Sequence, residues 1–428
     1  MDRVGVTTRV ILIILTTQEY PTSMRKHIFL FSFLSVWILQ AQDSYYNYIS
    51  LGDYQVGYAD TLIYDDSVFY EFDFYKGAAP LFVSVWYPLE QEQELEQEQE
   101  QEQEQEGGGV QGLQEKERMQ FGDFREADCP EMLQGIYEML QKQKDSASIW
   151  YHVEKDFVKL EPINYKVSTE EVLGQLKSLP TKSHRVPLIS KSNFPVIVYH
   201  HGAQGLQDEN YVMAEYFASR GFIFISANFH WPVSGKTYGT PIVWNGYNTT
   251  SPQKLMDFAR SITDSDKVFF MGHSMGAQTG YGFLRTIEDA TAFISMETTA
   301  EGASDAKLKD WWPHLMEIIQ KDSSEFRLPI LHLASKEMDQ PLNFYPFTKL
   351  TNAQITFMQS KKPFGHESYT TSYFMRYLFR KEFKQPDNKA MKEQLELFVK
   401  HLELIYDYIN SQVKGEGFKK LKYKDTFY

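Results

Sequence analysis

A serine enclosed by glycines is the part of this sequence best suited to chemistry. The segment GHSMG at 272–276 fits the spacing G-x-S-x-G, and it follows an apolar run and precedes a predicted helix. Where a buried strand passes into a helix, this spacing presents the serine on a sharp exposed turn, because the glycines let neighbouring backbone pass close. We therefore interpret Ser274 as a nucleophile and not as a turn serine. His273 is interpreted as a packing residue.

A serine nucleophile needs a general base that removes the proton of its hydroxyl group. In strand–turn–helix nucleophiles of this type the histidine comes later in the chain than the serine. His366 follows that order and lies in the loop KKPFGHESY, just beyond the last predicted strand, so we expect it to be the base. The other histidines after Ser274 belong to predicted helices or strands and are interpreted as structural: His314, His332 and His401.

The oxyanion that forms during acyl transfer needs backbone N–H donors. One donor normally belongs to the residue after the nucleophile, which is Met275 here, and another comes from the loop after an earlier strand. The segment YHHGAQG at 199–205 provides such a loop, and Ala203 is expected to be its donor.

The carboxylate that orients the histidine has more than one candidate. Glu297 and Asp339 each follow a predicted strand, and both strands come after the nucleophile. Glu337 is a weaker third candidate. Either strand end can reach one imidazole, and either carboxylate can orient it, so the residues alone leave Glu297 and Asp339 open.

The elements that must position these residues alternate between strand and helix. Continuous apolar runs predict buried strands, and periodic segments with capping residues predict helices between them. The predicted strands are 52–66, 79–88, 194–202, 222–231, 267–274, 292–298, 328–335 and 353–360. The alternation predicts an α/β fold, with a mostly parallel central sheet and helices on both of its faces. A final helix with an apolar stripe from Met391 to Ile409 is expected to dock on the sheet.

We expect one domain, 43–428, with two unusual segments. Nine glutamates alternate mainly with glutamine in the tract that ends in glycines at 90–109, and this tract is interpreted as a solvated loop. The segment 110–192 is polar with predicted helices, one of them at 129–144, and is interpreted as an insertion before the strand that leads to the oxyanion loop.

The first 42 residues are predicted to be a leader. Arg25 and Lys26 precede twelve mostly apolar residues, 28–39, which is the pattern of a secretory signal peptide that starts at Met24. Twelve residues are fewer than the roughly 20 that a membrane span needs. We therefore expect an exported protein, whether periplasmic, extracellular or at the cell surface, and favour this over membrane anchoring.

The composition of the 428-residue chain excludes several classes of protein. Apolar residues make up 42% and aromatic residues 15%, which excludes a disordered protein. The net charge of −14 and the lack of a basic patch argue against a nucleic-acid partner. Cys129 is the single cysteine, so an internal disulfide and a thiolate metal cage are excluded. Because no HExxH or similar ligand spacing is present, we do not expect a metal enzyme.

Several of these segments together resemble a known branch of the α/β hydrolases. The stretches FPVIVYHHGAQG, ASRGFIFISANFHW and KVFFMGHSMGAQTG are similar to those of platelet-activating-factor acetylhydrolases and dienelactone hydrolases. The acetylhydrolase pattern implies Glu297 as the acid, where that family usually has aspartate, and the dienelactone hydrolase pattern implies a residue near Asp339. Dienelactone hydrolases use a cysteine nucleophile, so Ser274 places the chain nearer the acetylhydrolases, and we favour Glu297.

The resemblance implies the α/β-hydrolase fold and a function for the site. We expect a serine hydrolase that cleaves small carboxylic esters through an acyl-enzyme, without a cofactor. Cleavage of amides or peptides by the same triad is the first alternative. A surface-binding protein with an inactive hydrolase scaffold is the second, because a fold does not determine a function.

Overall fold

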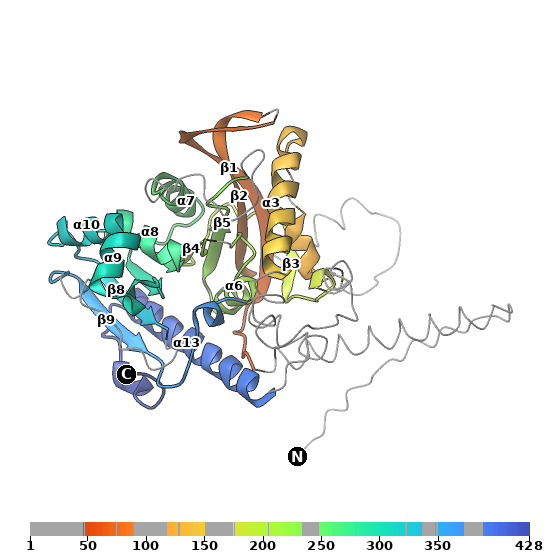
Figure 1. Cartoon of the computed structure of the whole chain (residues 1–428). Coiled ribbons are helices and arrows are strands. Elements are labelled where there is room, and N and C mark those ends of the chain that lie inside the picture. The colour runs from red at the N-terminus through yellow and green to blue at the C-terminus, as the bar shows by residue number, and fades with distance from the viewer. Residues whose placement is uncertain are drawn as a thin grey trace, which may run out of the picture.

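The protein is built around one mixed sheet, seen across the middle of Figure 1. The computed structural model describes residues 46, 48–73, 75–89, 118–126, 129–149, 174, 176–203, 205–232, 248–321, 323–335, 347, 350–371 and 388–428. Within that part of the chain, the strand order is β3-β1-β2-β5-β4-β6-β7-β8-β9. The strands are β1 Gln55–Phe72, β2 Tyr75–Leu89, β3 Ser183–Arg185, β4 Val196–His200, β5 Ile223–Ala227, β6 Val268–His273, β7 Ala292–Met296, β8 Pro329–Ala334 and β9 Gln354–Gln359.

Most neighbouring strands are parallel. β2 runs antiparallel to both of its neighbours, β1 and β5. The short strand β3 pairs in parallel with β1, and every pair from β5 to β9 is parallel. The carboxyl ends of β4, β6, β7 and β8 therefore meet at one edge of the sheet, where loops can bring distant residues together.

Helices cover both faces of the sheet (Figure 1). The helices are α3 Glu131–Ile149, α6 Tyr211–Ala218, α7 Thr250–Ser261, α8 Met275–Phe283, α9 Asp305–Trp311, α10 Pro313–Lys321 and α13 Asn388–Lys414, with short 3₁₀ turns η1 Phe121–Arg125, η4 Ala300–Gly302, η5 His366–Tyr369 and η6 Lys420–Tyr423. In β6, Phe269 and Met271 belong to the core formed with α6 and α13. Val268 and Phe270 belong to the opposite core, with α7, α8 and α10.

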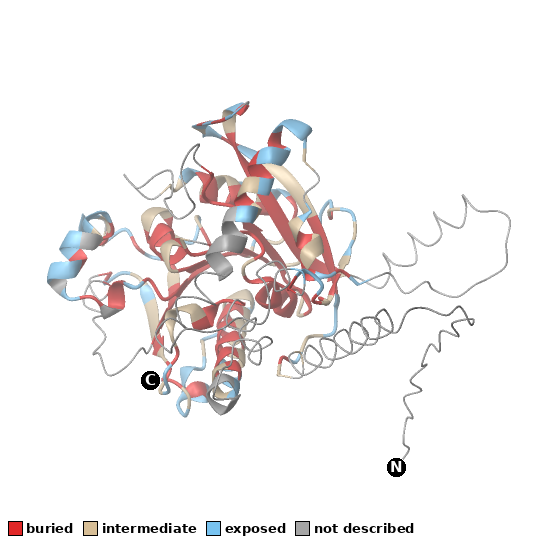
Figure 2. Cartoon of the chain, turned by 45° about the vertical axis from the view of Figure 1, so that its right-hand side comes forward, coloured by how far each residue is buried: buried red, intermediate tan, exposed pale blue. Residues whose placement is uncertain are grey.

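The double burial of β6 explains its uninterrupted apolar sequence, because a parallel strand is covered on both faces. Figure 2 shows buried residues throughout the central strands and exposed residues on the outer sides of the helices. This strand order, with helices on both faces and a helix directly after β6, is the α/β-hydrolase fold. The predicted fold class is confirmed.

The amino-terminal hairpin is longer than the sequence predicted. The strands expected at 52–66 and 79–88 continue to Phe72 and start at Tyr75, with a register shift between Asp65 and Phe69. The predicted strand ends at the aspartate pair 65–66 because aspartate is rare in strands. The buried carboxylate of Asp65 instead accepts hydrogen bonds of 2.7 Å from the hydroxyl groups of Thr250 and Ser251, which join the hairpin to α7.

The insertion before β4 contributes η1, α3 and β3 among its described residues. The helix predicted at 129–144 corresponds to α3, whereas the edge strand β3 was not predicted. None of the helices in the described part of the chain combines the length and apolar character that crossing a bilayer requires. The leader and the Glu/Gln tract lie outside the described residues, so the signal peptide and export stay predictions.

Candidate active site

Ser274 occupies a strained turn between β6 and α8. Its backbone has φ 54° and ψ −117°, a region that residues with a side chain rarely adopt. A Cβ atom on Gly276 would lie 2.1 Å from the carbonyl oxygen of His200, and one on Gly272 would lie 2.4 Å from the carbonyl group of Gly276. The turn is therefore possible only with glycines at both positions, which is the physical reason for the G-x-S-x-G spacing.

The backbone of the turn is tied to the neighbouring strand end. The N–H group of Ser274 lies 3.1 Å from the carbonyl oxygen of Met296 and 2.9 Å from that of Glu297. Met296 is the last residue of β7 and pairs with His273 in the sheet. Ser274 and Glu297 are thus held side by side at the carboxyl edge of the sheet.

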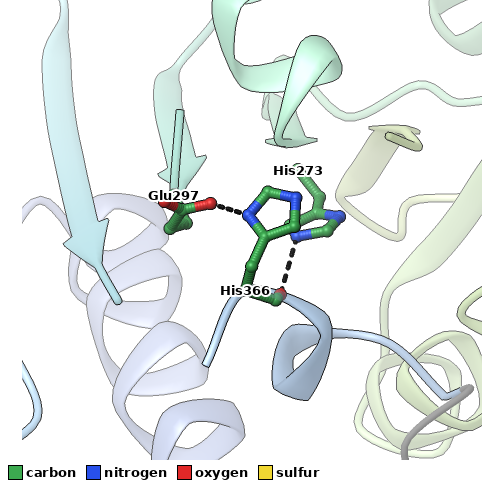
Figure 3. Close-up of side chains that lie close together, drawn as sticks. All are labelled: His273, Glu297 and His366. Atoms are coloured by element: carbon green, nitrogen blue, oxygen red, sulfur yellow. Dashed lines mark hydrogen bonds and ion pairs between the residues drawn. The ribbon is translucent and has the colours of Figure 1, made fainter. Parts of the chain in front are cut away.

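Glu297 meets the imidazole of His366 at this edge. Oε2 of Glu297 contacts Nδ1 of His366, as Figure 3 shows. His366 is the first residue of η5, and its side chain is 26% exposed, while that of Glu297 is 9% exposed. The carboxylate is therefore nearly enclosed, whereas part of the imidazole is open to solvent.

The turn after β7 that carries Glu297 has a rare backbone conformation, and several hydrogen bonds stabilise it. Glu297 and Thr299 both have positive φ, 52° and 69°. Oε1 of Glu297 accepts a hydrogen bond of 3.1 Å from the N–H group of Thr299. The carboxylate of Glu301 accepts bonds from the N–H group and the hydroxyl group of Thr298, at 3.1 and 2.8 Å. Gln278 of α8 donates a bond of 2.6 Å to the carbonyl oxygen of Thr298.

Glu301 also belongs to a second imidazole–carboxylate pair, which is fully buried. Its Oε1 atom lies 2.5 Å from Nε2 of His332, and the hydroxyl group of Tyr281 lies 2.8 Å from Nδ1 of the same ring. Burial by itself would raise the pKa of Glu301, but the adjacent imidazole and the bonds from Thr298 outweigh it, so its pKa is lowered. Glu301 was not among the predicted site residues, although ETTAEG shows a second carboxylate four residues after the first.

The loop that was predicted to hold an oxyanion donor passes directly beside Ser274. A Cβ atom on Gly202 would lie 3.3 Å from Cβ of Ser274. Ala203 follows Gly202 in this loop, and Met275 is the first residue of α8, so both predicted donors belong to backbone next to Ser274. Burial lowers the pKa of His200 to about 3, so its ring is neutral, and its Nδ1 donates to the carbonyl oxygen of His201 at 2.8 Å.

Residues of the insertion contact the segment directly after this loop. Nε of Arg125, in η1, lies 3.1 Å from the carboxylate of Asp208, and both side chains are buried. Nε2 of Gln207 lies 3.5 Å from the hydroxyl group of Tyr137 in α3. The insertion therefore contacts the segment that follows Ala203, a role that its polar sequence did not indicate.

The remaining predicted residues are placed as follows. Asp339 and Glu337 lie outside the described residues, so Glu297 is the candidate acid that the described structure brings to His366. His314 is exposed on α10. His401 is buried in α13, where its Nδ1 donates to the carbonyl oxygen of Leu397 at 2.7 Å.

His273 has a polar contact that the sequence did not indicate. Its ring is buried, as a packing residue would be. Its Nε2, however, lies 3.1 Å from the carbonyl oxygen of His366. The position of His273 in a buried strand predicts that its ring is buried. It does not predict a hydrogen bond to a loop 93 residues away.

The same cluster offers three groups that could ligate a metal. His273, Glu297 and His366 each provide a ligand atom, and these atoms lie within 4.8 Å of one another. Two imidazoles and a carboxylate suit zinc, but a ligand nitrogen must present a lone pair. Nδ1 of His366 faces a carboxylate and Nε2 of His273 faces a carbonyl oxygen, so both nitrogens carry protons. The arrangement therefore favours hydrogen bonding over metal ligation.

Comparison with known proteins gives matches only among solved structures. No protein-family model matches the sequence, and no curated protein matches it. The chain is similar to a ferulic acid esterase from Streptomyces cinnamoneus, with 13% identity and a TM-score of 0.44 over 83% of this chain and 89% of the other. It is also similar to the acylaminoacyl peptidase of Pyrococcus horikoshii, with 16% identity and a TM-score of 0.36 over 55% and 40%.

A third similar structure is the S-formylglutathione hydrolase of Agrobacterium tumefaciens, with 14% identity and a TM-score of 0.28 over 49% of this chain and 85% of the other. Likenesses this distant carry no conclusion about activity. The resemblance to platelet-activating-factor acetylhydrolases and dienelactone hydrolases stays a prediction.

Proposed function

We propose that this protein is a serine hydrolase that cleaves carboxylic esters through an acyl-enzyme, with Ser274 as nucleophile, His366 as general base and Glu297 as the acid. One observation carries the proposal. The imidazole of His366 contacts the carboxylate of Glu297, and the backbone carbonyl of that same glutamate accepts a hydrogen bond from the N–H group of Ser274. Contacts that link Ser274, Glu297 and His366 at one edge of the sheet support these three roles.

The first half-reaction forms the acyl-enzyme. Oγ of Ser274 attacks the ester carbonyl carbon while Nε2 of His366 takes the hydroxyl proton, so the imidazole becomes positively charged. The carboxylate of Glu297 stabilises that charge at Nδ1 and holds the ring in the required tautomer. The carbonyl oxygen becomes an oxyanion, and the N–H groups of Met275 and Ala203 are the donors that we propose for it.

The intermediate collapses when the carbon–oxygen bond to the leaving group breaks. Nε2 of His366 gives its proton to the departing alkoxide, which leaves as an alcohol. In the second half-reaction, water attacks the acyl carbon, His366 takes a proton from that water, and the carboxylic acid is released with the proton returned to Ser274. A water molecule is consumed for each ester, and no cofactor takes part.

The strained backbone of Ser274 contributes to this mechanism. Residues held in rare φ/ψ regions persist only where the surroundings enforce them, and they cluster at active sites. Here the two carbonyl groups of Met296 and Glu297 enforce it. With this conformation Ser274 lies at the boundary between β6 and α8.

The experiment that tests the proposal compares wild type with Ser274→Ala on p-nitrophenyl acetate. We expect turnover to fall by about 10⁴- to 10⁶-fold, because the variant lacks the attacking oxygen. A fluorophosphonate probe should label wild type at one site and should not label Ser274→Ala. Ser261→Ala is the matched control, because Ser261 is an exposed serine at the end of α7, and it should behave as wild type.

Two outcomes would overturn the proposal in different ways. Wild type that hydrolyses no activated ester and takes up no probe would favour a surface-binding protein. Equal turnover of p-nitrophenyl acetate and of the amide with the same acyl group, p-nitroacetanilide, would favour an amidase or peptidase.

A further inference from the structure

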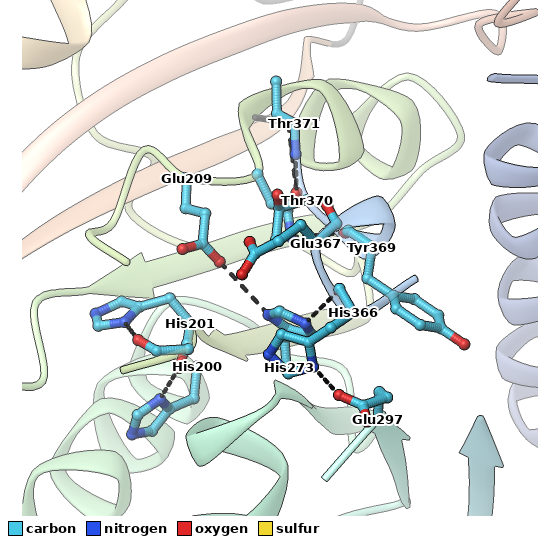
Figure 4. Close-up of polar contacts among 12 residues, drawn as sticks. His200, His201, Glu209, His273, Glu297, His366, Glu367, Tyr369, Thr370 and Thr371 are labelled. Carbon is cyan, nitrogen blue, oxygen red and sulfur yellow. Dashed lines mark hydrogen bonds and ion pairs between the residues drawn. The ribbon is translucent and has the colours of Figure 1, made fainter. Parts of the chain in front are cut away.

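The buried imidazole of His273 lies between two loops of the site (Figure 4). Its Nε2 is 3.1 Å from the carbonyl oxygen of His366, and its Nδ1 is 3.9 Å from Oε1 of Glu209, in the segment after the oxyanion loop. The ring centroids of His273 and His366 are 4.7 Å apart. His273 directly precedes the nucleophile, so a residue of the elbow itself contacts the main chain of the candidate base.

The chemistry of the two neighbours determines where the proton of His273 lies. A carbonyl oxygen can only accept, so Nε2 must carry the proton and donate it to His366. Burial, followed by the nearby His366, lowers the pKa of His273 well below its usual value, which keeps the ring neutral. Nδ1 then presents a lone pair and has no hydrogen-bond partner among the described residues. Among the described residues, the ring of His273 therefore makes one hydrogen bond, to the carbonyl oxygen of His366.

The loop that follows His366 is short and depends on outside anchors. Its helical part, η5, has only four residues. The side chain of Asn210, before α6, accepts a bond of 2.8 Å from the N–H group of Thr371 and donates one of 3.3 Å to the carbonyl oxygen of Tyr369. His273 secures the first residue of η5, and Asn210 secures the chain at and beyond its last residue.

We propose that His273 is a positioning residue, which holds the main chain of His366 so that the imidazole stays between Glu297 and Ser274. The carboxylate of Glu297 sets the orientation of the ring, and His273 sets the location of the backbone that carries it. This inference rests on the proposed function of Ser274 and His366. Displacement of a reacting group by 1 Å costs about 10²-fold in rate, so the loss of this anchor should act on turnover.

The test replaces His273 with residues that differ in where they place a donor. Glutamine carries its amide N–H at about the reach of Nε2, asparagine ends nearer the position of Nδ1, and phenylalanine keeps the ring but has no donor. For p-nitrophenyl acetate we expect His273→Gln to keep kcat within about 5-fold of wild type. His273→Asn and His273→Phe should lower kcat by about 100-fold and leave KM within about 3-fold.

His401→Phe is the matched control. His401 is also a buried histidine that donates to a carbonyl oxygen, but its acceptor is Leu397 in its own helix. This variant keeps the aromatic ring and should leave kcat within about 3-fold of wild type. The thermal midpoint of every variant is measured alongside, so that only folded proteins are compared.

The outcomes separate this inference from the function on which it rests. If wild type is inactive and is not labelled by fluorophosphonate, the proposed function fails. If wild type is active but His273→Gln and His273→Asn have equal kcat at similar thermal midpoints, the positioning role is wrong while the function stands. The Gln/Asn comparison decides this even if the phenylalanine variant does not fold.

Discussion

Among the described residues, two imidazole–carboxylate pairs share the turn after β7, with their carboxylates four residues apart, and they differ chiefly in burial. The side chains of His332 and Glu301 are 0% and 1% exposed, whereas those of His366 and Glu297 are 26% and 9% exposed. Both pairs join a histidine to the same turn after β7. The same two chemical groups are thus closed to solvent in one pair and partly open in the other, which is the pair we propose for chemistry.

The buried pair has both ring nitrogens occupied within the protein. Tyr281 contacts Nδ1 of His332 and Glu301 contacts Nε2, so a substrate has no access to that imidazole. In the site, Glu297 contacts Nδ1 of His366, and part of the ring is exposed. Glu301 of the buried pair stabilises the turn by accepting hydrogen bonds from Thr298. Glu297 of the exposed pair belongs to the same turn.

Among changes to these two pairs, the largest effect should come from Glu297→Gln, which removes the charge of the exposed pair and keeps its shape. We expect kcat on p-nitrophenyl acetate to fall by about 10⁴-fold, because the amide no longer stabilises the imidazolium or selects its tautomer. The free energy of unfolding should change little. Asp339→Asn is the matched control, and a larger loss there than in Glu297→Gln would assign the acid to Asp339.

A smaller effect, and on a different quantity, is expected for Glu301→Ala. Removal of one partner of a buried pair costs about 3–5 kcal/mol, because His332 and the donors of Thr298 lose their acceptor. Urea denaturation measures this loss in the free energy of unfolding. The double variant Glu301→Ala with His332→Phe should recover part of it. A loss below 1 kcal/mol in the single variant would contradict the structural role of this pair.

The smallest expected effect is on the pH dependence of stability, which should report on the buried pair of Glu301 and His332. The pKa of Glu301 is lowered from 4.5 in the folded protein, so its ionised form stabilises the fold. That contribution is complete above the unfolded pKa and is lost as the pH falls through 4.5 towards the folded value, by at most about 1.4 kcal/mol per pH unit. The difference in unfolding free energy between wild type and Glu301→Gln should therefore shrink from pH 6 to pH 3. A difference in unfolding free energy that grows as the pH falls would contradict the lowered pKa of Glu301.

The fold was predictable because its signals are local. The apolar runs of β4, β6, β7 and β8 and the glycines around Ser274 are visible within a few residues of sequence, and the structure confirms the fold that they predict. The full length of the hairpin is not predictable from local sequence, because the aspartate pair Asp65–Asp66 is typical of a strand end. The carboxylate of Asp65 instead lies within the hairpin. Its acceptors are satisfied by hydroxyl groups of α7, about 185 residues later.

The candidate site was less predictable because its contacts join distant segments. The sequence predicts His366 as the base because it lies in a loop after the last predicted strand, and this role stays a prediction. Glu297 and Asp339 both followed strands, and no local pattern separates two carboxylates at neighbouring strand ends. Glu301 and His273 were missed as supporting residues, because a buried residue in or after a strand looks the same whether or not its polar atoms bind a distant loop.

By itself the sequence determined the alternation of strands and helices and the sharp turn at Ser274, since periodicity and glycine spacing act over a few residues. Only the tertiary structure decided that Glu297 meets an imidazole 69 residues away and that His273 bonds to a carbonyl group 93 residues away. These contacts depend on the order in which strands pair across the sheet and on how loops pack at its edge. Both are properties of the whole chain.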